Sequence, residues 1–323
     1  MHAENLTMKI VFCGTPQFAV PTLEALLAAG HTVPLVVSQP DRPVGRDRVL
    51  TAPPVKQCAL AHAIAVTQPE KIRNNEEFRA QLEAIAPDAI VVVAYGRILP
   101  PWMLTLPRLG CINLHASLLP RYRGAAPIQW AVAMGDAVTG NTTMLLEEGL
   151  DTGPILLQQI VPIPPTATAA DMFLTLARQG APLVVETLAG LAAGTIQPQP
   201  QDHAQATLAP ILTRDDAQMG LAAHTAPQLY DRWRGFQPWP GAWTMLHGKK
   251  LIVHSMAVAA AAQIAAPTSA VPSALHVHQG RLYACCAGNT WLELIEIQHE
   301  GKKRLPAADF LRGAQLPSGA HLG

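Results

Sequence analysis

The chain contains 323 residues, of which 49% are hydrophobic and 14% charged, and its 23 Lys and Arg balance 23 Asp and Glu. A chain of this length can form two domains that each bury a core. A formal net charge of zero argues against a protein that coats nucleic acid along its whole length. No apolar run approaches the roughly 20 residues that span a bilayer, and residues 1–7 lack a secretory signal pattern. We therefore expect a cytoplasmic protein without a membrane partner.

The first third of the chain alternates short apolar strands with helices. Leu23, Leu26 and Leu27 share one face of a helix, and the apolar run at 88–94 is typical of a strand buried on both faces of a parallel sheet. Residues 39–56 form a polar loop with four prolines. The alternation predicts an α/β fold with a Rossmann-like, mostly parallel sheet. The predicted strands are 9–14, 31–38 and 88–94, and the predicted helices are 20–29, 55–63 and 69–85.

The second half of the chain changes character after a linker. Thr168 can cap the helix that follows it, and residues 197–212 are rich in Pro and Gln. The short runs beyond them predict a small, OB-like β-barrel, and an alanine-rich stretch at 258–270 reads as a surface loop. We predict a first domain over 8–196, a linker over 197–212 and a C-terminal barrel over 213–323. The barrel strands are expected at 250–254, 275–277, 281–285 and 291–297.

The sequence carries no signature of a metal or nucleotide cofactor. Five cysteines, an odd number, argue against a disulfide framework. Cys13 and Cys111 fall in apolar strand patterns and read as buried hydrophobes, while the pair Cys285 and Cys286 lacks the spacing of a zinc site. Gly14 ends a strand without the further glycines of a dinucleotide site or the GK[ST] of a P-loop. We predict no metal, no NAD and no ATP, and Gly14 remains open between a tight turn and a substrate contact.

The chemistry is expected near residues 111–156. Asn113 and His115 lie two residues apart in an apolar strand, so their side chains point to the same face. Pro120 stops the strand, which places both residues at a carboxyl end, the binding edge of open α/β sheets. Asp151 could meet them there. An amide, an imidazole and a carboxylate suit transfer through a tetrahedral oxyanion, although His115 could be a core histidine and Asp151 a turn residue.

The motifs in this region resemble a known family. Asn113, His115, SLLP at 117–120, YRG at 122–124 and GLDTG at 149–153 are similar to the folate-dependent formyltransferases. GAAPIQ at 124–129 narrows the resemblance to the branch that formylates methionyl-tRNA. Similarity extends from KIVFCGTPQFAVPTLEALL at the front to GKKRLPAADFLRG near the end.

The resemblance implies a reaction and its site. The formyl donor would be 10-formyltetrahydrofolate, and the acceptor would be the amino group of methionine on initiator tRNA. Asn113, His115 and Asp151 would be catalytic: the amide and imidazole donate to the oxyanion, and the carboxylate moves a proton and favours a charged imidazole. The residues that would contact the folate are Ser117, Leu118, Leu119, Pro120, Ala94, Tyr95, Gly96 and Glu148.

Two basic segments would contact tRNA by the same resemblance. The loop at 39–56 carries Arg42, Arg46 and Arg48, and guanidinium groups suit phosphates and base edges. Here Asp47 replaces the second glycine of the family's Gly-Arg-Gly. Residues 213–323 hold ten Lys and Arg against seven Asp and Glu, a net charge of +3, which leaves −3 for residues 1–212. The expected contacts in this half are Lys302, Lys303 and Arg304, with Arg232, Arg234, Lys249 and Lys250 also compatible, while the nearby Trp233, Trp239 and Trp243 are expected to pack rather than stack.

Other functions stay open at this stage. A formyltransferase acting on an amino sugar, or a formyl-folate hydrolase, would share the same three polar residues. A catalytically silent folate- or RNA-binding protein is a reading of another class, against which the intact trio argues. A glycinamide ribonucleotide formyltransferase would lack the basic C-terminal part. We expect the chain to act as a monomer.

Overall fold

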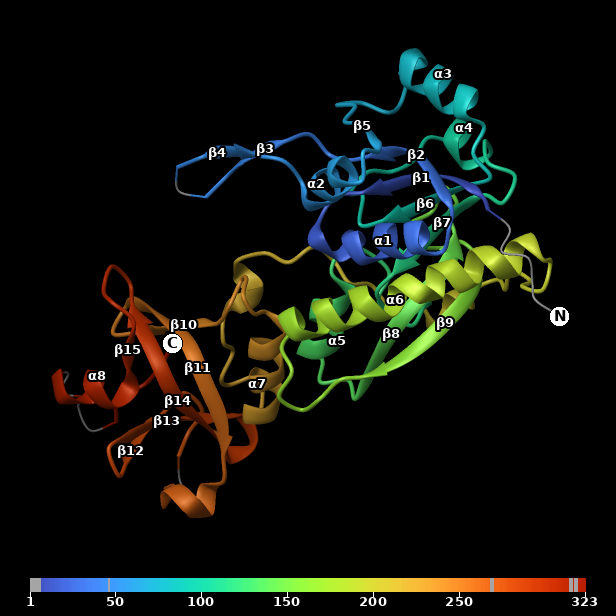
Figure 1. Ribbon diagram of the computed structural model, residues 1–323. Coiled ribbons are helices and arrows are strands. Elements are labelled where there is room, and N and C mark those ends of the chain that lie inside the picture. Colours follow the sequence, from blue (N-terminus) through green and yellow to red (C-terminus); the bar gives the residue numbers. More distant parts are fainter. Residues whose placement is uncertain (1–6, 46, 268–269, 314–315, 317–318) are drawn as a thin grey trace. The chain divides into compact units, whose positions relative to one another are not determined.

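A computed structural model describes residues 7–323 except 46, 268, 269, 314, 315, 317 and 318. The chain forms two compact units (Figure 1). The first contains the described residues up to Pro127 together with Val138–Pro162 and Asp171–Pro210. The second contains Ile128–Ala137, Ile163–Ala170 and the described residues from Ile211 onward. The boundary therefore does not fall at one point, because two short segments of the first half join the second unit.

The first unit is built on a seven-stranded sheet of order β5-β2-β1-β6-β7-β8-β9. Strands β1 (Lys9–Gly14), β2 (Thr32–Val37), β5 (Ala65–Thr67), β6 (Ala89–Val93) and β7 (Cys111–His115) are parallel. Strand β8 (Val138–Leu145) pairs antiparallel with β7, and β9 (Ile155–Pro162) pairs antiparallel with β8. This confirms the predicted Rossmann-like, mostly parallel sheet. The strand order reverses direction between β1 and β6, which is the point where open α/β sheets bind ligands.

Helices cover both faces of the central part of this sheet, and strands β1 and β6 are accordingly apolar on both sides. Buried side chains of β1 and β6, such as Val11 and Val92, pack with Phe78 and Leu82 of α3 (Glu76–Ile85) and with Met103 of α4 (Pro101–Leu104). Figure 1 shows α1 (Val20–Ala28) and α6 (Ala169–Ala192) along the opposite face, while α2 (Pro54–Ala61) follows the hairpin. The sequence helix at 20–29 is confirmed, and α6 begins one residue after Thr168.

Gly14 is required by packing at the end of β1. A Cβ atom there would lie 2.8 Å from the Phe12 ring and 2.9 Å from the Ala19 Cβ. Both distances are shorter than atoms tolerate without movement. The strand therefore turns into the following helix at a glycine because nothing larger fits, which favours the tight-turn interpretation of Gly14.

Two predictions for residues 39–85 were incomplete. The polar loop contains a two-stranded hairpin, β3 (Arg42–Val44) and β4 (Val49–Thr51), in which Arg42 pairs with Thr51. The predicted helix at 69–85 begins only at Glu76, because the Asn75 side chain accepts a hydrogen bond from the Phe78 N–H and caps it. Ile72 lies before the cap and is buried in the core. Its burial made a non-helical segment resemble a helix face.

The second unit is an antiparallel half-barrel, which confirms the predicted small C-terminal β-domain. Its sheet has the order β10-β11-β14-β13-β12, with β15 paired to β14. Backbone bonds from Gly323 N–H to Met245 and from Leu322 N–H to Ser273 join the two edges of this sheet. The elements are α7 (Ala226–Gly235), β10 (Trp243–Leu246), β11 (Lys249–Ala259), β12 (Leu275–His278), β13 (Arg281–Cys286), β14 (Thr290–His299), β15 (Leu305–Pro306) and α8 (Ala307–Gly313), together with α5 (Pro127–Ala133), most of which lies in this unit.

The second unit differs from the prediction at two points. Trp239 is 53% exposed and does not pack, whereas Trp233 lies against the core. The alanine-rich stretch is not wholly a surface loop, since β11 runs to Ala259 and Ile264 is buried against Trp291. Within the described ranges, no helix has the length and apolar character to cross a membrane.

Candidate active site

Strand β7 carries Asn113 and His115 to the carboxyl edge of the sheet. Asn113 pairs with Val92 of β6 on one side and with Met144 of β8 on the other. His115 is the last residue of the strand. Because alternate residues of a strand share a face, the two polar side chains lie on the same side, as the sequence pattern predicts.

His115 is held between a carbonyl oxygen and a carboxylate. Its Nε2 lies 2.9 Å from the Tyr122 carbonyl oxygen, and its Nδ1 lies 3.7 Å from Oδ2 of Asp151. A carbonyl oxygen can only accept, so Nε2 carries a hydrogen in this contact. Nδ1 therefore faces Asp151 either as an acceptor or, in the imidazolium, as a second donor. The His115 and Asp151 side chains are 7% and 15% exposed.

Asp151 is positioned by a turn between β8 and β9. Its φ is 51°, in the left-handed region that non-glycine residues rarely adopt. Its Oδ2 accepts a hydrogen bond of 2.7 Å from the Gly124 N–H. A Cβ at Gly153 would lie 1.9 Å from the Leu145 carbonyl oxygen, so the turn can close only with glycine there. The GLDTG motif thus brings a carboxylate to the histidine.

The Asn113 side chain is half-buried, and its Oδ1 is buried without a hydrogen-bond partner in the part of the chain that the structure describes. Buried polar atoms in folded proteins nearly always have a partner. An amide whose oxygen is unsatisfied beside His115 is therefore available to a bound substrate.

The SLLP segment is fixed by hydrogen bonds to the turn that follows it and to side chains of β8 and β9. Ser117 is fully buried, and its hydroxyl donates to the Arg121 carbonyl oxygen at 2.6 Å. The Thr142 hydroxyl donates to the Ser117 carbonyl oxygen, and Gln158 donates to that of Leu119. Leu118 and Pro120 are half-buried. The Ser117 hydroxyl is thus committed within the protein, and these last two side chains remain to face a ligand.

Residues 94–96 present their backbone rather than the tyrosine ring. Ala94 and Gly96 are exposed, with φ values of 46° and 81°. Tyr95 is 2% exposed and packs in the sheet core, where its hydroxyl has no partner among the described residues and burial raises its pKa well above the usual value. Its carbonyl oxygen accepts from the Thr15 hydroxyl. Glu148, in the turn before Asp151, is exposed.

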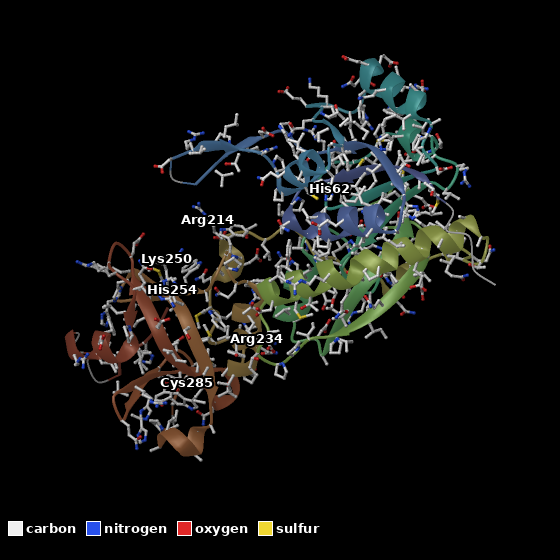
Figure 2. The ribbon with its side chains drawn as sticks, in the orientation of Figure 1. His62, Arg214, Arg234, Lys250, His254 and Cys285 are labelled. Carbon is white, nitrogen blue, oxygen red and sulfur yellow. The ribbon has the colours of Figure 1, made fainter. Side chains whose placement is uncertain are left out.

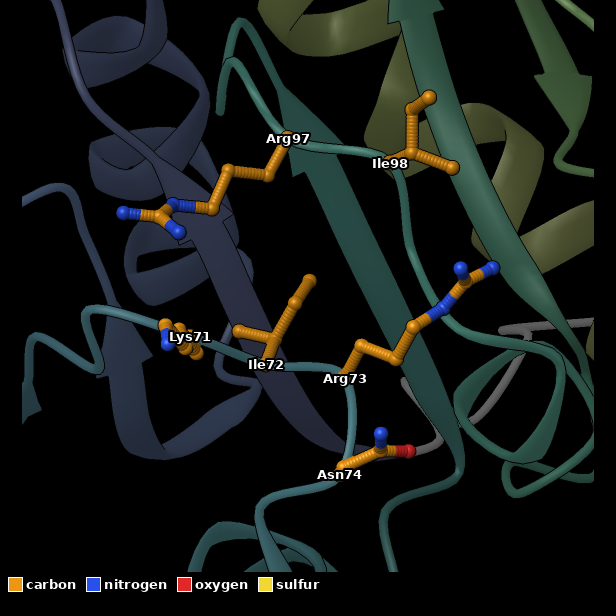
Figure 3. A pocket seen from close by; sticks show the side chains of 6 residues that line it. All are labelled: Lys71, Ile72, Arg73, Asn74, Arg97 and Ile98. Carbon is orange, nitrogen blue, oxygen red and sulfur yellow. The ribbon is translucent and has the colours of Figure 1, made fainter.

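A basic pocket lies beside residues 94–96 (Figure 3). Its volume is about 470 Å³, and Ile98 at its edge is 83% exposed. Arg97 donates to Oε1 of Gln39. The sequence did not indicate this pocket, because two of its cations fall in the segment that resembles a helix. The lining residues are Lys71, Ile72, Arg73, Asn74, Arg97 and Ile98.

The basic residues predicted to contact tRNA differ in exposure and in whether an acidic side chain already pairs with them. Arg42 and Arg48 are exposed on the hairpin, and Arg46 lies outside the described residues. Lys302 and Lys303 are exposed in the connection between β14 and β15, whereas Arg304 forms an ion pair with Glu296.

Arg234 and Lys250, which are labelled in Figure 2, were also suggested by the sequence for tRNA contact, but both have other partners. Arg234 is 3% exposed, pairs with Asp231 at 2.5 Å and donates to the Ala167 carbonyl oxygen. The prediction that Arg234 is a surface contact was wrong, because its guanidinium is buried and bonded to groups of the second unit. Lys250 lies over the Trp243 ring, 4.2 Å from the centroid.

Family models and individual relatives both match this chain to formyl transferases. A formyl transferase model matches residues 8–188, and a model for the formyl transferase C-terminal domain matches 212–315. A methionyl-tRNA formyltransferase of Acidobacterium capsulatum is 65% identical over 98% of this chain and 100% of its own length. One of Koribacter versatilis is 56% identical over 98% and 99%.

A solved structure shares the fold at low identity. The N-formyltransferase of Helicobacter canadensis, in complex with folinic acid and dTDP-3-aminofucose, aligns with a TM-score of 0.65 at 16% identity, over 91% of this chain and 100% of that one. The matched models together span most of both units, and the two relatives extend over nearly the whole chain. On these grounds, the chain belongs to the formyl transferase family.

Proposed function

We propose that this protein transfers a formyl group from 10-formyltetrahydrofolate to the amino group of methionine esterified to initiator tRNA. The observation that carries the proposal is the full-length identity of 65% and 56% with relatives named methionyl-tRNA formyltransferase. The solved neighbour that holds an amino sugar is only 16% identical. The sugar alternative is therefore supported by the fold alone.

The donor fits the residues at the sheet edge. A flat, polar heterocycle needs backbone hydrogen-bond partners and an apolar wall, and the exposed backbone of 94–96 together with Leu118 and Pro120 offers both. The buried, unpartnered Oδ1 of Asn113 supports a ligand in contact with that amide. The folate supplies the formyl carbon as a co-substrate. A resident metal has no part in this proposal.

Asn113 and His115 would stabilise the transition state. When the amine attacks, a carbon–nitrogen bond forms and the formyl oxygen becomes an oxyanion. The Asn113 amide can donate to that oxygen while its Oδ1 accepts from the attacking amine. Because His115 Nε2 is committed to the Tyr122 carbonyl oxygen, only Nδ1 can act on the substrate. It acts as a donor in the imidazolium form, whose charge Asp151 balances.

Asp151 would carry the proton that balances the reaction. The attacking amine loses one proton, and the folate nitrogen gains one when its bond to the formyl carbon breaks. A carboxylate that accepts the first proton and returns it to the leaving nitrogen completes the transfer. No covalent enzyme intermediate is required.

The basic segments would recognise the tRNA. We assign Arg42, Arg46 and Arg48 to the acceptor end of the tRNA, and Lys302, Lys303 and Arg304 to its phosphates. On this proposal, residues 8–196 perform catalysis and 213–323 bind tRNA. Residues 197–212 connect the two, and of these 197–210 belong to the first unit. The protein would act as a cytoplasmic monomer.

The proposal is tested by offering three acceptors with 10-formyltetrahydrofolate: charged initiator tRNA, charged elongator tRNA and a free amino sugar. We expect formylated methionine on initiator tRNA, less product on the elongator and none on the sugar. Formylation of the sugar alone would overturn the proposal. Donor binding without any product would favour the silent binding protein.

A further inference from the structure

Both groups that contact His115 lie in turns with an unusual backbone. Tyr122, whose carbonyl oxygen accepts from Nε2, has a φ of 61°, and Asp151, whose carboxylate faces Nδ1, has a φ of 51°. Left-handed backbone at non-glycine residues is strained and persists where neighbouring groups hold it. The geometry of the imidazole therefore depends on whatever holds these two turns.

Gln201 holds the Asp151 turn. Its side chain is buried, with 6% exposed. Its Nε2 donates to the Asp151 carbonyl oxygen at 2.9 Å and to that of Gly153 at 2.7 Å. Both hydrogens of the amide are thus used on the backbone of the turn that carries the carboxylate.

Arg123 fixes the opposite end of the same amide. Oε1 of Gln201 accepts from Nε of Arg123 at 3.1 Å and from its Nη2 at 2.6 Å. A rotated amide would place its oxygen against two carbonyl oxygens and its NH₂ against a guanidinium, so only one orientation satisfies all four contacts. Arg123 is itself buried, with 7% exposed, and directly follows Tyr122.

Thr207 holds the Tyr122 turn. Its hydroxyl accepts from the Tyr122 N–H at 2.8 Å, and its carbonyl oxygen accepts from the Arg123 N–H at 2.8 Å. The Ala209 N–H donates to the Arg123 carbonyl oxygen at 2.7 Å. A Cβ at Gly124 would lie 2.8 Å from the Ala209 carbonyl oxygen, so this close approach requires glycine.

We propose that Gln201 and Thr207, in the segment that leads from the first unit to the second, are positioning residues that set the distance between His115 and Asp151. This inference rests on the proposed function, because it assumes that these two side chains perform the transfer. Neither positioning residue needs to touch the substrate. They act by fixing the two turns on which the partners of His115 are carried.

The variant Gln201→Glu tests this role selectively. A glutamate keeps the length and still accepts from Arg123, but it cannot donate to the Asp151 and Gly153 carbonyl oxygens. We expect kcat to fall about 10- to 100-fold, the scale for misplacing a catalytic group by about an ångström, with the donor Kd unchanged. The matched control is Gln199→Glu, which makes the same change at an exposed position of the same segment and should keep the kcat of the parent.

A double-mutant cycle separates positioning from a general loss of structure. If Gln201 acts through Asp151, then Gln201→Glu should have little further effect on kcat in an Asp151→Asn background. An unchanged factor in both backgrounds would overturn the proposal, and so would equal kcat values for the Gln201→Glu and Gln199→Glu proteins.

Thr207 gives an independent test at an exposed position, where a fold defect is not expected. Thr207→Val removes the hydroxyl acceptor and should lower kcat about tenfold, whereas Thr207→Ser should restore it. A fully active Thr207→Val protein would remove Thr207 from the proposal. Each of these tests compares a variant with the parent enzyme. If the proposed function were wrong, the parent itself would not formylate methionyl-tRNA, so the two failures can be distinguished.

Discussion

His115 has one free nitrogen, and this limits its chemistry. The Tyr122 carbonyl oxygen occupies Nε2 at 2.9 Å, so Nδ1, turned to Asp151 at 3.7 Å, is the only ring atom left for a substrate. A distance of 3.7 Å is too long for a hydrogen bond but short enough for a charge interaction. On the proposed mechanism, His115 would hold charge and Asp151 would move the proton.

Removing either side chain should slow turnover without unfolding the protein. We expect His115→Ala and Asp151→Asn each to lower kcat by about 10²-fold or more, the scale for losing general acid–base help. Donor affinity and melting temperature should change little. His62→Ala, at an exposed histidine of the first unit (Figure 2), is the matched control. Turnover close to that of the parent would remove the altered residue from the mechanism.

Asn113 should act through the oxyanion. Its amide oxygen is buried without a partner among the residues described, so the side chain contributes little to the folded state by itself. We expect Asn113→Ala to lower kcat by about 10²-fold, or about 3 kcal/mol of transition-state stabilisation. A variant whose main change was a lower melting temperature would show that the residue is structural.

At the scale of elements, the β3–β4 hairpin is the segment that we propose for tRNA recognition, and it carries none of the proposed catalytic residues. Its strands are short, and Val44, Val49 and Leu50 are 58%, 63% and 68% exposed. Arg42 lies on the first strand and is exposed as well. Apolar and cationic groups that protrude together suit the bases and phosphates of an RNA end.

Arg42→Ala should therefore weaken the use of charged tRNA and leave donor affinity unchanged. We also expect it to reduce the preference for initiator over elongator tRNA, measured as the ratio of kcat/KM for the two. Arg79→Ala, at an exposed arginine of α3 that pairs with Glu83, should behave like the parent. Equal discrimination by the Arg42→Ala enzyme and the parent would refute the assignment of the hairpin to tRNA selection.

Asp88, the residue before β6, contacts the start of β1 and the turn before β7, and it should make stability depend on acid pH. Its carboxylate accepts from the Lys9 N–H at 2.8 Å and from Arg108 at 2.7 Å. The Lys9 hydrogen bond, followed by the Arg108 contact, lowers the pKa of Asp88 from its ordinary value of 3.8. The folded state therefore gains stability from this carboxylate above about pH 4 and loses it as the pH falls through the lowered pKa.

Asp88→Asn should reduce the free energy of unfolding at pH 7 by about 1 kcal/mol. Its effect should shrink as the pH falls below about 4, where the parent carboxylate also becomes protonated. Urea unfolding at several pH values measures both effects, with Glu77→Gln on the surface of α3 as control. A difference from the parent that stayed constant down to acid pH would contradict the linkage.

At the scale of the whole molecule, the charge is divided along the chain. Residues 213–323 carry a net charge of +3 and residues 1–212 a charge of −3. Part of the basic charge is already paired within the protein, since Arg234 is buried with Asp231 and Arg304 pairs with Glu296. Lys302 and Lys303 are exposed and can meet phosphates.

Replacing Lys302, Lys303 and Arg304 together with alanine should weaken tRNA binding and reduce its salt dependence. Each lost phosphate contact lowers the slope of log K against log salt by about 1. Arg304→Ala alone should change the slope less than Lys303→Ala, because Arg304 already has an ionic partner. Unlike the hairpin variant, the triple variant should weaken initiator and elongator tRNA alike. An unaltered slope would exclude this segment from the interface.

The sequence by itself determined the features that depend on neighbours along the chain. The strand period of two placed Asn113 and His115 on one face. Pro120 indicated that the strand ends near them, although β7 already ends at His115. Alternating strands and helices predicted the parallel sheet. Local patterns failed at 69–75, where burial of Ile72 imitated a helix face, although the Asn75 cap was a readable signal.

Only the tertiary structure decided which distant groups meet. Asp151 lies beside His115 because Gly153 lets its turn close against Leu145. Arg234, which reads as a surface cation, is buried because carbonyl oxygens of residues 164 and 167 converge on it. Gln201, in a stretch that reads as a solvated linker, is buried under the Asp151 turn. Composition and periodicity predict exposure only on average, whereas a hydrogen bond between residues 50 positions apart exists only once the chain has folded.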